Sequence, residues 1–431
     1  MPLLYDTGMV LYRLGIHLAA PFVPKARAWV EGRKAGRQRL PSCAEALQGC
    51  LWMHCASVGE FEQGRPVLEA IKAARPGLPV LLTFFSPSGY EAFKDHPLAT
   101  HVDYLPADTS RNARSWTALL RPRCAIFIKY EFWYHHLQAL HAEGVPTYLV
   151  SGTFRPDQPF FHWYGRTWRR MLGAYDHIFT QDERSAELLA RIGIHHVTVS
   201  GDTRFDRVGA IVAADPQIPL AQAYRQASEL PLLMAGSTWS PDDDLLAEAL
   251  RMLRRPVRTV LVPHEPVPAH LDRTTSRFSG PVVRWSALER ELARSSPRTK
   301  PPHEPPDQDP LFARTLVVDR TGLLARLYRY ADITYVGGGF TDGIHSILEP
   351  AAWGRPVIFG PHNRKFPEAA GLIEAGGGFE VRDSRGLAEV LQRLLGDAHA
   401  LERASLAAGL FVRERMGATR RVVDAILPRT E

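Results

Sequence analysis

A repeated alternation of short apolar runs and helical patterns constrains the fold of this chain more than any other feature. The alternation begins near residue 50. In the first half the apolar runs cover 51–55, 80–84, 102–105, 125–128, 147–150, 177–180 and 197–200. Helical patterns lie between them, for instance over 64–74, 133–143 and 183–192. Continuous apolar strands that alternate with helices predict a parallel sheet covered on both faces.

The alternation pauses at 213–220, where the sequence AADPQIPL is typical of a linker, and then starts again. Further strands are expected at 232–235, 259–262, 282–285, 315–318, 333–336 and 357–359, and helical patterns over 387–395 and 400–426 close the chain. A chain of 431 residues is long enough for two domains. The predicted fold class is therefore α/β, with two Rossmann-like doubly wound parallel-sheet domains and a ligand cleft between them.

Composition limits the kinds of partner. The hydrophobic fraction of 45% and the charged fraction of 23% are those of a globular protein, and the net charge of +6 favours an anionic partner. No aromatic-interleaved, zinc-finger or basic-helix pattern indicates nucleic acid as a partner. The four cysteines have no metal spacing. With no cleavable signal peptide, they indicate a reducing, cytoplasmic location.

The N-terminal segment 1–40 is predicted to be an amphipathic membrane anchor. Its first two dozen residues are mostly apolar but are interrupted by Asp6, Arg13 and His17, which is unfavourable for a transmembrane helix. A basic cluster that includes Trp29 follows, and this order is typical of a helix lying on anionic headgroups. A helix that packs on the protein is the alternative. A second unusual segment, the Pro-rich 294–310, is predicted to be a mobile surface loop.

The first candidate site is Ser57–Glu60 (SVGE), which follows the first apolar run and opens a helical pattern. Ligands bind at the carboxyl ends of the strands in open α/β sheets, and a carboxylate there can act as a general base on a hydroxyl group. Ser57 and Glu60 also fit a capping box, so both interpretations stay open.

The second candidate site is Lys129–Trp133 (KYEFW), again directly after an apolar run. Lys129 and Glu131 are placed to bind an anion and to orient a polar substrate. The alternative is a solvated ion pair beside core aromatic residues.

The third candidate site is glycine-rich and follows the strand expected at 333–336. Gly337–Gly339 lead to His345, Ser346 and Glu349, so that helix N–H groups would face a phosphate and Glu349 would reach ribose hydroxyls. Glu349 as a cap three residues after Ser346 is the alternative. A parallel turn with Ser237 and Thr238 follows the strand at 232–235 and offers small residues and hydroxyls for close phosphate approach.

Competing signals are weak. Asp242–Asp244 is explained as an acidic first helical turn after Ser240, which leaves no clear metal site. His264 and Glu265 do not form H-E-x-x-H, and there is no G-x-S-x-G elbow.

Together, these motifs resemble the Kdo (3-deoxy-D-manno-octulosonate) transferases of lipopolysaccharide assembly. The resemblance runs in order through HCASVGE (54–60), FSPSG (85–89), KYEFW (129–133), GDTRFD (201–206), AGST (235–238) and LEPAAWGRPVIFGP (348–361). The apolar-basic N-terminus also resembles that family's membrane anchor.

The resemblance implies a GT-B glycosyltransferase that uses CMP-Kdo as donor, needs no metal or other cofactor, and inverts the configuration. The acceptor would be a lipid A precursor (lipid IVA) at the cytoplasmic face of the inner membrane. Residues 41–212 would bind the acceptor and 213–431 the CMP-sugar. The implied catalytic residues are Glu60 and Glu131. CMP would contact Ser237, Thr238, Gly337, Gly338, Gly339, His345, Ser346 and Glu349, and the acceptor would contact Ser57, Gly59, Lys129 and Arg204.

Two places depart from the commoner family pattern. His264 follows Pro263 where many members carry an arginine, and Gly343–Ser346 reads GIHS where many read GGHN. Two rival hypotheses remain. One is a GT-B enzyme that uses a UDP-sugar, such as a lipid-A-disaccharide synthase or a nucleotide-sugar epimerase. The other is a non-catalytic lipid- or phosphate-binding protein.

Overall fold

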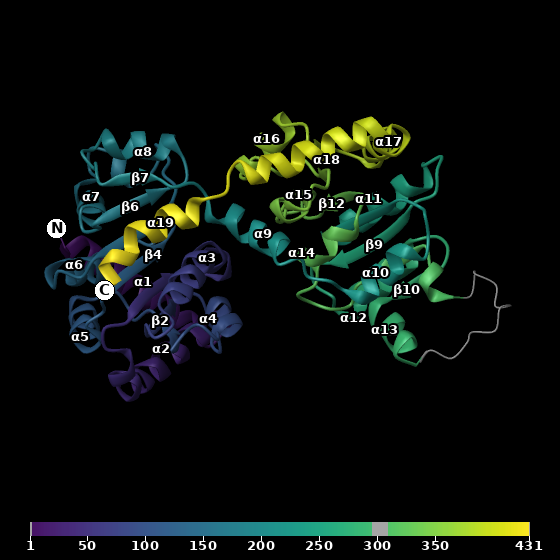
Figure 1. Cartoon of the computed structure of the whole chain (residues 1–431). Helices are drawn as coiled ribbons and strands as arrows, with labels where there is room; N and C mark the ends of the chain where they lie inside the picture. Colours follow the sequence, from purple (N-terminus) through teal and green to yellow (C-terminus); the bar gives the residue numbers. More distant parts are fainter. Residues whose placement is uncertain (1, 295–308, 431) are drawn as a thin grey trace. The chain divides into compact units, whose positions relative to one another are not determined.

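The computed structural model describes residues 2–294 and 309–430, and the chain forms two compact units (Figure 1). Unit 1 contains Met1–Arg207 and Arg415–Glu431, and unit 2 contains Val208–Glu414. Most of the predicted loop 294–310 lies outside the described residues.

Unit 1 is built on a seven-stranded, fully parallel sheet. Its strand order is β3-β2-β1-β4-β5-β6-β7, so the chain winds first to one edge and then to the other. Its strands are β1 (Leu51–Cys55), β2 (Val80–Phe84), β3 (His101–Tyr104), β4 (Cys124–Ile128), β5 (Thr147–Gly152), β6 (His177–Thr180) and β7 (Val197–Val199). Its helices are α1 (Pro2–Ala19), α2 (Pro24–Cys43), α3 (Val58–Ala74), α4 (Pro87–Phe93), α5 (Ser110–Leu120), α6 (Tyr134–Ala142), α7 (Arg166–Leu172), α8 (Glu183–Ala190) and α19 (Ala418–Ile426).

Unit 2 repeats this architecture with the order β10-β11-β9-β8-β12-β13-β14, again fully parallel. Its strands are β8 (Leu232–Thr238), β9 (Arg258–Pro263), β10 (Val282–Arg284), β11 (Thr315–Val317), β12 (Ile333–Val336), β13 (Val357–Phe359) and β14 (Gly378–Glu380). Its helices are α10 (Pro219–Gln226), α11 (Ser240–Arg251), α12 (Pro268–Arg277), α13 (Trp285–Arg294), α14 (Leu324–Leu327), α15 (Leu348–Ala352), α16 (Pro367–Glu374), α17 (Ser384–Gly396) and α18 (Ala398–Arg413). Helix α9 (Thr203–Ala213) contains the boundary between the units.

Each sheet separates two apolar clusters, as continuous apolar strands require. In β1, Trp52 belongs to the cluster on one face, whereas Leu51, Met53 and Cys55 belong to the cluster on the other face. The sheet of unit 2 is covered in the same way. All thirteen strands expected from the sequence are present, and the prediction of two doubly wound domains is confirmed. Only the short edge strand β14 was missed.

The C-terminal segment differs from the expectation. The sequence predicted one helix over 400–426 within a second domain that covered 213–431. The helix is interrupted at Gly417, whose φ of 103° lies in the left-handed region, and the chain continues as α19 in unit 1. There Val422, Val423 and Ile426 join the apolar cluster beneath α3. Figure 1 shows α19 in yellow across unit 1. Amphipathic periodicity predicts which face of a helix is buried, but it does not say which unit buries that face.

Because α19 completes the core of unit 1, we expect Ile426→Ala to destabilise that unit by about 2–4 kcal/mol. Ile426 is fully buried. The exposed Asp424 on the same helix provides a matched control, and Asp424→Ala should change stability by less than about 0.5 kcal/mol. Denaturant unfolding of the full chain measures both variants. Equal stability of Ile426→Ala and the wild type would contradict this role of α19.

Candidate active site

The first two predicted motifs meet at the switch point of the unit 1 sheet. Strands β1 and β4 are neighbours, but β1 continues toward one edge of the sheet and β4 toward the other. Ser57–Glu60 follow β1 and Lys129–Trp133 follow β4. Their parallel strands end at the same edge, so the structure brings both motifs together where doubly wound sheets bind ligands.

Glu60 lies in the first turn of α3 and is partly exposed. Ser57 occupies the N-cap position but makes no side-chain capping bond; its hydroxyl donates to the carboxylate of Glu60 instead. The capping-box alternative therefore does not describe this helix start. What remains is a carboxylate at the carboxyl edge of the sheet that solvent, and hence a substrate hydroxyl, can reach.

Glu131 has a very different environment. It is only 4% exposed, and its Oε2 lies 2.8 Å from His54 Nε2 and accepts a hydrogen bond of 2.5 Å from Trp133 Nε1. The Tyr175 hydroxyl donates to the backbone carbonyl of Glu131 at 2.5 Å. His54 Nδ1 lies 3.0 Å from Thr83 Oγ1. These contacts hold Glu131 in one position, because a buried carboxylate requires hydrogen-bond partners.

The carboxylates of Glu60 and Glu131 both affect the pKa of Cys55, the last residue of β1. Burial raises the pKa of the Cys55 thiol well above its usual range, and the negative charges of Glu131 and Glu60 raise it further. Cys55 therefore stays protonated and is an inert core residue between two acidic groups.

The other residues predicted to bind the acceptor substrate lie at different positions relative to this edge of the sheet. Gly59 is exposed in the first turn of α3. Lys129 has a φ of 70°, which turns the chain sharply after β4, and its Nζ lies 5.3 Å from the centroid of the Tyr130 ring. Arg204 follows β7 and pairs with Asp202 at 2.7 Å. The structure thus joins Lys129 to the Glu60–Glu131 edge through β4, whereas Arg204 binds Asp202 in the loop after β7.

The glycine-rich motif occupies the corresponding switch point in unit 2, where β8 and β12 are neighbours. An added Cβ at Gly337 would lie 2.3 Å from the Ser237 carbonyl oxygen. At Gly338, whose φ is 89°, it would lie 2.3 Å from the Gly343 carbonyl oxygen. The two turns that follow β8 and β12 therefore pack backbone against backbone, which only glycine permits here.

Asp242 holds this arrangement together from α11. Its Oδ2 accepts hydrogen bonds from the backbone N–H groups of Gly338 (3.0 Å) and Trp239 (2.9 Å), and its Oδ1 accepts one from the Tyr335 hydroxyl (2.7 Å). Burial raises the pKa of Asp242, while these three bonds favour its charged form. The sequence explained Asp242 as part of an acidic helical turn; its additional role as the anchor of the glycine turn depends on a contact 96 residues away in the chain.

Asp243 and Asp244 have separate partners. Asp243 accepts a hydrogen bond of 2.5 Å from Thr274, and Asp244 pairs with Arg277. Within residues 2–294 and 309–430, no group of three or more acidic, histidine or cysteine side chains is arranged to hold a metal ion.

Thr238 ends β8 beside the glycine turn and is fully buried, and its Oγ1 has no hydrogen-bond partner among the residues that the structure describes. Ser237 adopts a φ of 53°. A buried hydroxyl without a partner costs about 1–3 kcal/mol and is typically satisfied by ordered water or a ligand. This position therefore fits the predicted use of Thr238 in ligand binding.

An aromatic stack borders the same turn. His345 lies 4.2 Å from His264, centroid to centroid, and Trp239 lies 4.7 Å from His264. Trp239 Nε1 donates a 3.0 Å hydrogen bond to His345 Nε2, which places the proton of the neutral ring on Nδ1. Burial and the nearby His264 lower the pKa of His345 to about 4. No role was predicted from the sequence for Trp239 or His264, although each directly follows a strand.

The positions of Ser346 and Glu349 differ from those predicted from the sequence. The predicted phosphate-facing helix begins at Leu348 rather than at Ser346 and has only five residues. Ser346 is exposed in the preceding loop, and Glu349 is in the first helical turn. Glu349 also raises the pKa of the buried Tyr328 hydroxyl, a smaller effect than that of burial.

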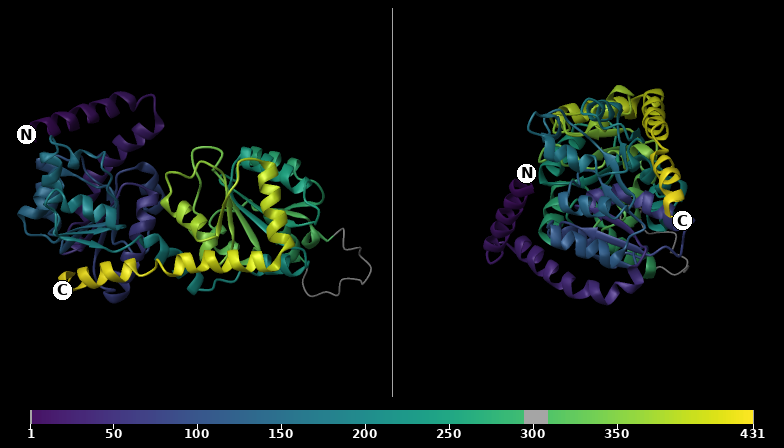
Figure 2. Two further views of the ribbon diagram at one scale, coloured as in Figure 1. Left: turned by 90° about the horizontal axis from the view of Figure 1, so that it is seen from above. Right: turned by 90° about the vertical axis from the view of Figure 1, so that its left-hand side faces the viewer.

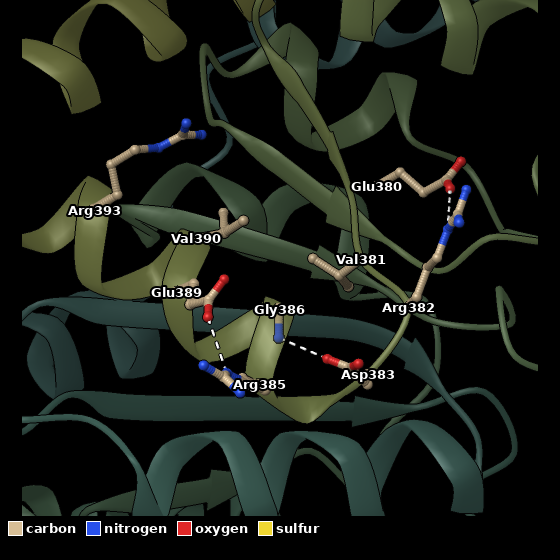
Figure 3. A pocket seen from close by; sticks show the side chains of 9 residues that line it. All are labelled: Glu380, Val381, Arg382, Asp383, Arg385, Gly386, Glu389, Val390 and Arg393. Carbon is tan, nitrogen blue, oxygen red and sulfur yellow. Dashed lines mark hydrogen bonds and ion pairs between the residues drawn. The ribbon is translucent and has the colours of Figure 1, made fainter.

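A hollow of about 580 Å³ lies beside β14 and the start of α17 (Figure 3). Arg382 pairs with Glu380 and Arg385 pairs with Glu389, so the lining cations are largely balanced by lining acids. We do not include this hollow in the candidate active site.

Because burial and the nearby His264 lower the pKa of His345 to about 4, and Trp239 occupies its Nε2, we expect this imidazole to remain neutral at about pH 5.5, where an ordinary histidine is mostly protonated. Since the folded-state pKa is lowered, the resulting stabilisation should be lost as the pH falls from about 6.5 toward 4. Nitrogen-15 NMR of the ring measures this, with Trp239→Phe expected to shift the pKa upward. A wild-type titration near pH 6.5 would contradict the assignment.

Comparison with known proteins identifies relatives over most of the chain. The family described as 3-deoxy-D-manno-octulosonic-acid transferase (Kdo transferase) matches residues 30–207. The 3-deoxy-D-manno-octulosonic acid transferase of Bordetella pertussis is 29% identical over 97% of this chain and 99% of its own length. The protein of the same name from Aquifex aeolicus is 26% identical over 83% of this chain and 88% of its own length.

Solved structures support the fold. The UDP-GlcNAc 2-epimerase of Neisseria meningitidis superimposes with a TM-score of 0.59 at 13% identity, over 88% of this chain and 99% of that one. A glycosyltransferase of Rickettsia africae gives a TM-score of 0.56 at 12% identity, over 89% and 99%. These similarities establish the two-domain GT-B architecture alone. Residues 30–207 therefore match the Kdo transferase family, and over most of its length the chain is similar to glycosyltransferases of that name.

Proposed function

We propose that this protein transfers Kdo from CMP-Kdo to a hydroxyl group of a lipid A precursor during lipopolysaccharide biosynthesis, with inversion of configuration. The observation that carries the proposal is Glu60, a partly exposed carboxylate at the sheet switch point that does not serve as a helix cap in a chain that matches this family over residues 30–207. A protein that only binds lipid or phosphate needs cations there rather than a second, buried carboxylate.

Glu60 is the proposed general base. As the acceptor oxygen forms its bond to the anomeric carbon of Kdo, the bond from that carbon to the phosphate of CMP breaks, and CMP leaves with the electron pair. The acceptor proton passes to Glu60. Ser57, whose hydroxyl donates to Glu60, orients the carboxylate.

Glu131 is proposed to shape the acceptor pocket. Its carboxylate is held by His54 and Trp133, so it keeps a fixed orientation beside Lys129 and Tyr130. Such a preorganised group can position a polar acceptor without reorganising during the reaction.

The glycine turn of unit 2 is proposed to hold CMP. Gly337–Gly339 pack against neighbouring backbone, and around this turn Ser237, Thr238, His345 and Ser346 are the proposed donors to the phosphate. Glu349 is proposed to accept hydrogen bonds from the ribose hydroxyls. The chain's own N–H and O–H donors would stabilise the leaving phosphate, so no metal is part of the proposal.

Helix α1 is proposed to attach the protein to the cytoplasmic face of the inner membrane. Figure 2 shows α1 and α2 along the outside of unit 1. Exposed apolar side chains lie along α1 and the turn after it; they are Leu4, Val10, Leu11, Tyr12, Leu14, Leu18, Phe22 and Val23. Among the helices described, none combines the length and apolar character needed to span a bilayer. An exposed apolar helix next to a basic one is typical of a monotopic anchor.

The direct test is the mass of the product formed from CMP-Kdo and a tetra-acylated lipid A precursor. We expect the acceptor to gain one or more Kdo units, and we expect the same yield in excess EDTA. UDP-GlcNAc serves as the donor control and should give no product. Transfer from UDP-GlcNAc but not from CMP-Kdo would support the rival GT-B enzyme, and loss of activity in EDTA restored by Mg²⁺ would refute the metal-free reaction.

Two isosteric variants separate the proposed roles. Glu60→Gln cannot accept a proton, so it should lose at least about a hundredfold in turnover while CMP affinity and thermal stability stay unchanged. Glu349→Gln, the matched control in unit 2, should weaken CMP binding in calorimetry. Near-normal turnover of Glu60→Gln would end the proposed mechanism, and unchanged CMP affinity of Glu349→Gln would remove the ribose contact.

A further inference from the structure

Besides α1, unit 1 displays a second exposed apolar surface, which is aromatic and lies on the loop after β5. Trp163 is 92% exposed, and Tyr164 and Trp168 are also exposed. Their rings contact in sequence, with centroids 5.6 Å apart for Trp163 and Tyr164 and 6.4 Å apart for Tyr164 and Trp168. Residues 155–170, which follow β5, are called the aromatic-basic segment below.

The aromatic-basic segment is firmly held from beneath. Phe160 is buried and packs on Phe132 and Phe154, with centroids 4.7 and 5.9 Å away. Arg169 Nη1 donates to the backbone carbonyls of Phe160 (2.9 Å) and His162 (3.0 Å). Trp163 is therefore presented to solvent by an anchored loop. A contiguous cluster of exposed aromatic side chains on such an anchored loop indicates an interaction site.

The charge of the segment indicates the partner. It contains four arginines (Arg155, Arg166, Arg169 and Arg170) and one acid, Asp157, which pairs with Arg155 at 3.6 Å. Arg155, Arg166 and Arg170 are exposed. Tryptophan and tyrosine rings flanked by arginines fit the headgroup region of a bilayer that contains anionic lipid, where the rings lie at the interface and the arginines meet phosphates.

The segment lies beside the candidate acceptor site. Arg155 Nη1 donates to the Tyr130 hydroxyl at 3.4 Å, and Phe132 packs on Phe160, so two residues of the Lys129–Trp133 motif touch the segment. Helix α1 reaches the same region, because Tyr5 lies 5.6 Å from Tyr134 at the start of α6, against which α7 packs. In Figure 1 the N-terminus, α6 and α7 lie at the same end of unit 1.

We propose that the aromatic-basic segment is a second membrane contact, which inserts Trp163, Tyr164 and Trp168 into the interface of a bilayer that contains anionic phospholipid. With α1 as the first contact, two attachment points fix how unit 1 lies on the bilayer. The Lys129–Trp133 edge then faces the headgroups, where a lipid acceptor presents its sugar hydroxyls. This orienting role rests on the proposed lipid acceptor, but membrane insertion of the segment does not.

The test is partition of the full-length protein onto vesicles of equal parts phosphatidylcholine and phosphatidylglycerol at physiological salt. The double variant Trp163→Ala/Tyr164→Ala should lower the partition coefficient about tenfold, because α1 still binds. The matched control is Leu406→Ala/Leu410→Ala, which removes two exposed apolar side chains from α18 in unit 2 and should change nothing. Arg166→Gln/Arg170→Gln should reduce the preference for phosphatidylglycerol over pure phosphatidylcholine vesicles.

Insertion of Trp163 itself is measured by quenching of indole emission with acyl-brominated phosphatidylcholine, which should be weaker in Trp163→Phe than in the wild type. Unchanged partition of the Trp163/Tyr164 variant, or an equal loss in the Leu406/Leu410 control, would overturn the proposal. If partition is unchanged and the variant instead loses a dimer that the wild type forms in sedimentation velocity, the surface is a self-association site and the proposal is wrong.

Failure of this proposal is separable from failure of the proposed function. Transfer of Kdo to an acceptor dispersed in detergent should proceed in the Trp163/Tyr164 variant within about twofold of the wild type, because these side chains are outside the reaction site. If wild-type protein binds vesicles through Trp163 but transfers no Kdo, the membrane contact stands and the proposed function is wrong.

Discussion

The sites in both units depend on the same constraint of a doubly wound parallel sheet. Where neighbouring strands continue toward opposite edges, the loops after them diverge and leave open backbone at the carboxyl ends. In unit 1 these strands are β1 and β4, which lead to Glu60 and Glu131; in unit 2 they are β8 and β12, which lead to Thr238 and Gly337. The sheet order therefore creates each candidate site, and the local residues decide what chemistry that site could perform.

Glu60 and Glu131 show how environment separates two residues of the same type. Glu131 is buried and bound by His54 and Trp133, so it is fixed in place and cannot move toward a substrate without breaking these bonds. Glu60 is partly exposed and bonded to the Ser57 hydroxyl, which can rotate as the carboxylate takes up a proton. The assignment of Glu60 as base and Glu131 as a positioning group follows from this difference in burial.

Much of the fold could be predicted because apolar runs identify buried parallel strands directly, and three candidate site motifs could be proposed because each follows such a strand. What could not be predicted depends on contacts between distant residues. Asp242 binds Gly338 across 96 positions, and α19 packs in unit 1 although it follows unit 2. The aromatic-basic segment was also missed, because Trp163 in sequence looks like a core residue and only its exposure shows otherwise.

At Pro263–Pro266 the sequence differs from the commoner Kdo transferase pattern, and the structure shows what His264 contacts there. His264 stands where many family members carry an arginine, and it stacks on His345, whose pKa is lowered to about 4. A neutral His345 donates a hydrogen bond but supplies no positive charge, whereas an arginine is permanently charged. A leaving phosphate beside this stack would therefore depend more on oriented N–H donors than on a fixed cation. One such donor, the Nδ1–H of His345, is positioned by the glycine turn, because the His345 backbone N–H donates to the Gly337 carbonyl at 3.1 Å and Asp242 binds the Gly338 N–H. Phosphate binding at the proposed site would therefore depend on backbone geometry that a buried carboxylate maintains.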